Sequence, residues 1–139
     1  HIGHEQRSEK LTRNLCERWR VPVACKELAE LVAREHGNIH QSLGFGAEAV
    51  LRLLVRCDAL RRPERFLLAL QACECDARGR LGKEEEAYAQ GPRLALLLKA
   101  AQSVDSAAVS AQALQDGLNG PAVGARVEVA RVAAIAAAL

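Results

Sequence analysis

Three residues that can bind a metal ion or transfer a proton, His4, His36 and Asp58, each lie at the end of an apolar helical stripe. His40 follows His36 by one helical turn. Neutral imidazole and carboxylate are ligands of first-row divalent ions. Because burying such groups without partners is costly, the three side chains should share a cation or one another. The sequence therefore predicts that His4, His36 and Asp58 converge inside a helical bundle as a metal site.

The stripes that lead to these residues are made of side chains three or four positions apart. They are Ser8, Leu11, Leu15 and Trp19 after His4, Cys25, Leu28, Leu31, Val32 and Ile39 around His36, and Ala47, Leu51 and Leu54 before Asp58. The same pattern is typical of ordinary core histidines whose hydrogen bonds are satisfied within the protein. That alternative stays open beside the metal site.

The composition favours an all-α helical bundle. Half of the 139 residues are hydrophobic and only 3% are aromatic, and Ala and Leu dominate. A chain of this length buries roughly two-thirds of its unfolded surface. No apolar run approaches the roughly 20 residues that span a bilayer. We expect about six or seven helices with a real core, and no membrane partner.

The helices are expected over residues 4–18, 23–40, 47–60 and 63–77, then from 92, from 105 or 106 to 115, and from 121 to the end. Pro22 and Pro63 mark breaks or first turns, and Asp105 or Ser106 is the expected cap of the sixth helix. Gly79 is the expected left-handed cap of the fourth.

The five cysteines indicate free thiols. They are odd in number and contain no C-x-x-C pair, and they are Cys16, Cys25, Cys57, Cys73 and Cys75. This usage is typical of a reducing cytoplasm. Cys73 and Cys75 could hold a soft metal, but a second pair is lacking.

Arginine dominates the positive charge. The net charge is +2, and Arg outnumbers Lys by fifteen to four. Arginine forks bind phosphate in bidentate geometry, although a genome that prefers Arg produces the same excess.

Several strings, in order, resemble one family. They are HIGHEQR at 1–7, RVP at 20–22, the pair His36 and His40, DALRRPER at 58–65, CECDARGR at 73–80, and GLNGPAVG at 117–124 followed by Ala130 and Arg131. In these strings the chain resembles the carboxy-terminal part of the bacterial CCA-adding tRNA nucleotidyltransferases of the multifunctional type, which carry an HD phosphohydrolase domain.

This resemblance implies a parent enzyme that adds CMP and AMP from CTP and ATP to the tRNA 3′ end with Mg²⁺. Its HD part hydrolyses 2′,3′-cyclic phosphates and 2′-nucleotides with Ni²⁺ or Mn²⁺. Residues 1–80 would be the later part of the HD domain, and 81–139 a helical tail that contacts tRNA. The nucleotidyltransferase residues and the HD dyad are expected upstream, so an inactive fragment is expected. A homodimer stays open.

Carried over by position, His4, His36 and Asp58 would be catalytic metal ligands. Gly37 stands where relatives commonly have Asp, which removes a carboxylate. Five arginines would contact tRNA phosphates, and they are Arg61, Arg62, Arg65, Arg78 and Arg80. The alternative for them is a solvated face with Glu64 as counter-charge.

His40 and Glu74 would orient a metal-bound imidazole by hydrogen bonding. For Glu74 the favoured alternative is an ion pair with Arg78 or Arg80. Two rival functions also remain, a free-standing HD phosphohydrolase that acts on nucleotides and a non-enzymatic helical RNA-binding or adaptor module whose histidines fill the core.

Overall fold

The computed structural model describes residues 3–139, and this part of the chain contains seven α-helices and no strand. The helices are α1 (His4–Arg18), α2 (Val23–Gln41), α3 (Ala47–Arg56), α4 (Pro63–Arg78), α5 (Gln90–Gln102), α6 (Ser106–Gln115) and α7 (Pro121–Ala138), with a 3-10 turn at Ser42–Gly44 between α2 and α3. The predicted all-α fold is confirmed. His1 and Ile2, the first two residues of the 1–7 string, lie outside the described residues.

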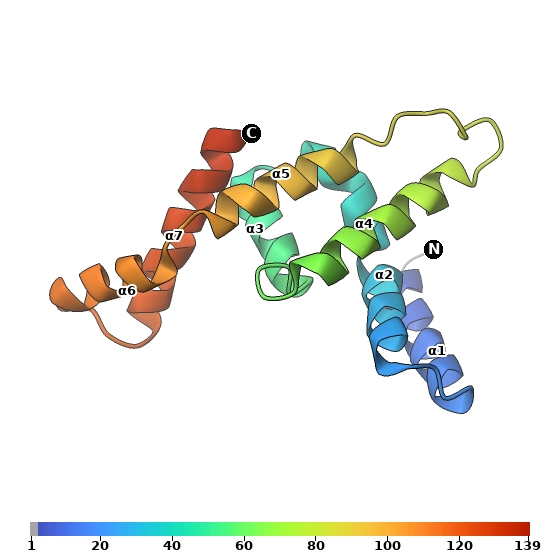
Figure 1. Cartoon of the computed structure of the whole chain (residues 1–139), viewed down its shortest axis with the longest axis horizontal. Coiled ribbons are helices and arrows are strands. Elements are labelled where there is room, and N and C mark those ends of the chain that lie inside the picture. Colours follow the sequence, from blue (N-terminus) through green and yellow to red (C-terminus); the bar gives the residue numbers. More distant parts are fainter. Residues whose placement is uncertain (1–2) are drawn as a thin grey trace.

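The helices follow one another along an elongated molecule (Figure 1). α1 and α2 form a hairpin at one end, and α2 packs on α4. α4 packs on α5, which with α3 and α6 contacts α7 at the opposite end. The connection 79–89 leaves α4 and returns to α5, so it lies on the same side of the molecule as the carboxyl end of α2.

One cluster of buried side chains joins five of the helices. Its largest fully buried members are Leu31 and Ile39 from α2, Leu53 and Leu54 from α3, Phe66 from α4, Leu94 and Leu97 from α5, and Ile135 from α7. The cluster draws on residues from both sides of position 80. No helix among residues 3–139 combines the length and the apolar character that a membrane crossing needs.

Most helix boundaries follow the local signals. Asp105 caps α6 by accepting a hydrogen bond of 3.0 Å from the Ala108 amide, and Pro63 and Pro121 stand in the first turns of α4 and α7. Gly79 is not a left-handed cap, because its φ is −68°.

The third helix is shorter than expected and ends at Arg56 instead of residue 60. Asp58 has a φ of +52°, its amide bonds to the Val55 carbonyl, and the Ala59 amide bonds to the Leu54 carbonyl. This pair of bonds is the Schellman closure of a helix. An aspartate fills the left-handed position that glycine usually takes, so the sequence signal for the helix end was weak.

The apolar stripe of α1 does not face the core, contrary to expectation. Leu11 is 68% exposed and Trp19 71% exposed, while Cys16 is the buried residue of this helix. α1 packs chiefly on α2, and ion pairs hold the two together: Arg34 reaches Glu9 at 3.0 Å. Two further ion pairs join the helices, Arg13 with Glu30 and Lys26 with Glu17, whereas the leucines of α1 lie exposed.

All five cysteines are free thiols, as predicted. Cys57 and Cys73 are fully buried, and burial raises the pKa of each thiol to about 12. Both stay protonated near neutral pH and are unreactive. Cys75 is exposed, so it does not share a buried site with Cys73.

Candidate functional site

Three histidines form a row across α1 and α2. The ring centroids of His4 and His36 are 5.8 Å apart, and those of His36 and His40 are 6.0 Å apart, both in edge-to-face orientation. His36 and His40 share a face of α2 because they are four residues apart. Gly37 helps α1 to approach, since a Cβ at this position would lie 2.5 Å from the Glu5 Oε1 atom. The structure therefore brings His4 and His36 together, as the sequence predicted.

The hydrogen bonds of His36 fix its tautomer. Its Nδ1 atom lies 3.0 Å from the Val32 carbonyl and 3.2 Å from the Ala33 carbonyl. A carbonyl only accepts, so Nδ1 carries the proton and donates. The Nε2 atom of the neutral ring then keeps its lone pair, which can accept a proton or bind a ligand.

His40 stands between a carboxylate and a phenol. Its Nε2 atom is 2.9 Å from Asp76 Oδ2, and its Nδ1 atom is 2.8 Å from the Tyr88 hydroxyl oxygen. The carboxylate accepts from Nε2–H, so in the neutral ring the phenol donates to Nδ1. Burial raises the pKa of Tyr88 and keeps it protonated. The resulting chain of hydrogen bonds connects α2, α4 and the 79–89 connection.

Asp76 and Tyr88 were not among the residues predicted for the site. Tyr88 is the only tyrosine of the chain and lies two residues before the start of α5. A single buried hydroxyl needs a partner, which is the one signal that pointed to it. The pairing joins positions 48 residues apart, so no local pattern contains it.

Asp58 does not join the histidines. Its carboxylate accepts hydrogen bonds from Arg61 at 2.7 and 3.0 Å, which holds its pKa below the ordinary value. Arg65 lies 3.9 Å from Asp58 and 3.6 Å from Glu27 in the second turn of α2. His36 is nine residues further along that helix, about 13 Å along its axis. The expected convergence of three residues is therefore corrected to a pair of histidines.

The described residues do not by themselves complete a site for a divalent metal ion. Among residues 3–139, no three His, Cys, Asp or Glu side chains lie together as ligands. His4 and His36 supply two nitrogens, whereas structural and catalytic sites of transition metals use at least three protein ligands. His40 and Glu74, which were expected to orient a metal-bound imidazole, contact protein groups instead.

The predicted RNA-binding arginines differ in their partners. Four of them pair with carboxylates: Arg61 with Asp58, Arg62 with Glu27 at 2.7 Å, Arg65 with both, and Arg78 with Glu74 at 3.0 Å. For Glu74 this is the ion pair that the sequence favoured. Arg80 has no ion pair with any described residue, so its charge is the one that is not already neutralised.

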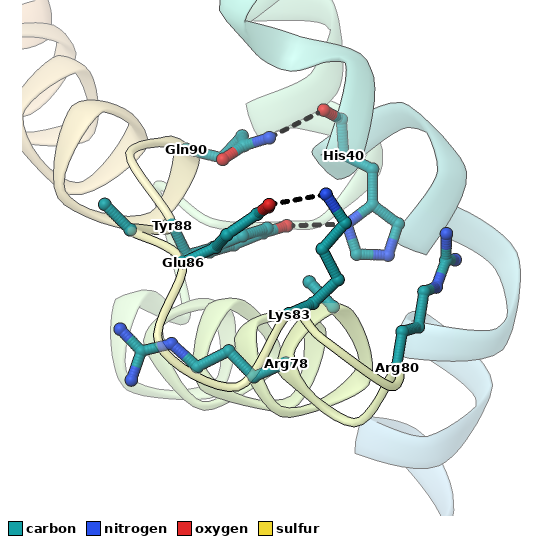
Figure 2. Close-up of a pocket in the computed structure, with 9 residues that line it drawn as sticks. His40, Arg78, Arg80, Lys83, Glu86, Tyr88 and Gln90 are labelled. Carbon is teal, nitrogen blue, oxygen red and sulfur yellow. Dashed lines mark hydrogen bonds and ion pairs between the residues drawn. The ribbon is translucent and has the colours of Figure 1, made fainter.

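A pocket of about 260 Å³ opens beside the histidine row, between α2, α4 and the 79–89 connection (Figure 2). Its polar lining consists of His40, Arg78, Arg80, Lys83, Glu86, Tyr88 and Gln90. Three of the four charged side chains are positive. The structure thus defines a helical protein with a row of imidazoles next to a basic pocket.

Comparison with known proteins shows which family the chain is similar to. The chain is 60% identical over 98% of its length to the Multifunctional CCA protein of Leptothrix cholodnii, 57% identical over 97% to that of Polaromonas naphthalenivorans, and 61% identical over 94% to that of Paracidovorax citrulli. No family model and no solved structure matches it. The resemblance to the multifunctional CCA proteins is confirmed, and the chain spans about a third of the length of these curated relatives.

Proposed function

We propose that this chain is a carboxy-terminal region of a CCA-adding tRNA nucleotidyltransferase. Residues 1–80 would be the later part of an HD phosphohydrolase domain and 81–139 a helical tail that helps to hold tRNA. The whole protein would work in the cytoplasm and extend tRNA 3′ ends with CTP, ATP and Mg²⁺. The observation that carries this proposal is the identity of about 60% to multifunctional CCA proteins over nearly the whole chain.

The phosphohydrolase part of the proposal is supported by the histidine row. His36 has a free lone pair on Nε2 and a fixed ring orientation, as a general base or a ligand requires. Of a site for Ni²⁺ or Mn²⁺, this chain would supply only His4 and His36, with the other ligands coming from outside it. The substrates would be 2′,3′-cyclic phosphates and 2′-nucleotides.

The test is a chimera in which this chain replaces the matching third of the Leptothrix cholodnii protein. We expect the chimera to extend tRNA lacking its CCA end and to hydrolyse 2′,3′-cyclic AMP. His36→Ala should lower the hydrolysis at least about 100-fold and leave CCA addition nearly unchanged. Gln41→Ala, an exposed change near the same end of α2, is the matched control.

Two results would contradict the proposal separately. A chimera that folds but does not add CCA would remove the assignment to a nucleotidyltransferase. Equal hydrolysis of 2′,3′-cyclic AMP by the chimera and its His36→Ala variant would remove the phosphohydrolase role.

A second candidate, a non-enzymatic RNA-binding or adaptor module, is favoured by one observation. His40 is hydrogen-bonded at both nitrogens, and the rings of the row pack edge to face, as in a structural cluster. Thermal unfolding of the chimera and of its His36→Ala variant with Mn²⁺ or Ni²⁺ distinguishes the two, because an ion that binds at the histidines must raise the midpoint of the chimera more than that of the variant. With an adaptor, the chimera and the variant would show the same increase.

A further inference from the structure

The pocket beside His40 is built by tertiary contacts and not by one flexible segment. Gln90 donates to the His40 carbonyl at 2.9 Å, and Arg93 of α5 donates to the Ser42 and Phe45 carbonyls at 2.7 and 3.0 Å. With the bond between Tyr88 and His40, these contacts fasten the end of the 79–89 connection to α2. Figure 2 shows Tyr88, Gln90 and His40 on the wall of the pocket.

The donors of the pocket are not all used. The Tyr88 hydroxyl already donates its proton to His40, and the Gln90 amide already donates a proton to the His40 carbonyl. Lys83 is paired with Glu86. Arg80 has no ion pair among residues 3–139, and in Figure 2 its side chain rises on the side of the pocket that His40 lines. Arginine carries five N–H donors and stays charged at all relevant pH values.

The volume and the charge of the pocket indicate which kind of ligand it can bind. A pocket of about 260 Å³ is smaller than the roughly 300–1,000 Å³ of sites for drug-sized molecules, so it suits a small group. An anionic group with several acceptor oxygens matches arginine and lysine donors. We propose that this pocket binds the phosphate group of a nucleotide or RNA end, with Arg80 as the principal contact and Lys83 as the second. This proposal rests on the proposed function only for the source of the phosphate, which is a nucleotide or an RNA end.

Glu86 allows a variant that should strengthen phosphate binding, beside the Arg80 variant that should weaken it. Its carboxylate now pairs with Lys83, so a bound phosphate must compete with it for the same ammonium group. Removing the charge of Glu86 should therefore strengthen phosphate binding, while removing Arg80 should weaken it.

The experiment measures binding of inorganic phosphate and of adenosine 2′-monophosphate to the full 139-residue chain by calorimetry at low salt. We expect Arg80→Ala to weaken both at least about tenfold, because a charge-assisted hydrogen bond is lost. Glu86→Gln should tighten both several-fold. Arg52→Ala, which removes an exposed arginine on α3, should change neither.

A short single-stranded RNA with a 3′-hydroxyl identifies the source of the phosphate. Binding of the monophosphate that depends on Arg80 assigns the pocket to a terminal phosphate. RNA binding that depends on Arg80 without monophosphate binding would contradict the proposal, because the contact would then be with the RNA backbone. If no probe binds, or if Arg80→Ala binds as well as the unchanged chain, the proposal is wrong. The chimera could still add CCA and hydrolyse 2′,3′-cyclic AMP, so the two proposals fail independently.

Discussion

Charged and polar side chains gather at both ends of α2, but the charges neutralise one another at only one of these ends. Near its start, Glu27 and Asp58 are each held by arginines, and these charges neutralise one another. Near its end, His40, Asp76 and Tyr88 are linked by hydrogen bonds, and Arg80 beside them keeps its charge unpaired among the described residues. Having a reactive side chain is thus not enough to make a site, because the partners decide whether it is available.

Among the variants that test this comparison, the largest loss of stability is expected at Tyr88, which is only 8% exposed. Tyr88→Ala should lower the free energy of unfolding by about 3 kcal/mol, because a buried ring is lost. Tyr88→Phe should cost about 1 kcal/mol, the value of the hydrogen bond to His40. Urea unfolding measures both. Equal losses for the two variants would mean that the ring does not hold the 79–89 connection in place.

A smaller effect is expected in the middle of α2, between its two ends. Glu35 is 2% exposed and accepts hydrogen bonds from Asn38 at 2.9 Å and from Arg56 at 3.2 Å. Glu35→Ala should destabilise the chain by about 2 kcal/mol, since its partners are left without an acceptor. If urea unfolding shows no loss, the buried carboxylate does not stabilise the contact between α2 and α3.

The acid response should come from the start of α2. The pKa of Asp58 is lowered by its hydrogen bond from Arg61, and that of Glu27 by its hydrogen bond from Arg62. A lowered folded-state pKa adds stability above the ordinary values of 3.8 and 4.5, and this stability is lost as the pH falls through the folded-state values.

Asp58→Asn isolates the contribution of Asp58, because asparagine also tolerates the left-handed backbone of position 58. Thermal midpoints measured from pH 6 downward should fall less steeply for this variant than for the unchanged chain. An identical slope would show that the ion pair between Asp58 and Arg61 does not contribute.

The smallest effect is expected on the exposed stripe of α1, which belongs to neither end. Leu15 is half exposed, and Leu11 and Trp19 more so. Leu11→Lys and Leu15→Lys should each change the free energy of unfolding by less than about 0.5 kcal/mol. A clear loss in urea unfolding would mean that this stripe is covered when the chain is in solution.

Local signals predicted the helices well and the site only in part. Proline, the Asp105 cap and the helical period of the apolar residues placed most boundaries, because each acts within a few residues. The end of α3 was missed, since an aspartate occupies the left-handed position at 58. The inward face of α1 was also predicted wrongly, because its ion pairs with α2 could not be read from the spacing of its leucines.

The sequence by itself determined the helical class, the free thiols, the shared face of His36 and His40 on one helix, and the family resemblance. Only the tertiary structure decided that His4 stands beside His36, that Asp58 is bound by arginines beside Glu27, nine residues before His36 on α2, and that Tyr88 and Asp76 bracket His40. The physical reason is the separation along the chain over which each interaction acts. Helix formation depends on neighbours three and four residues away, whereas the partner of a charged or polar group is fixed by how helices pack.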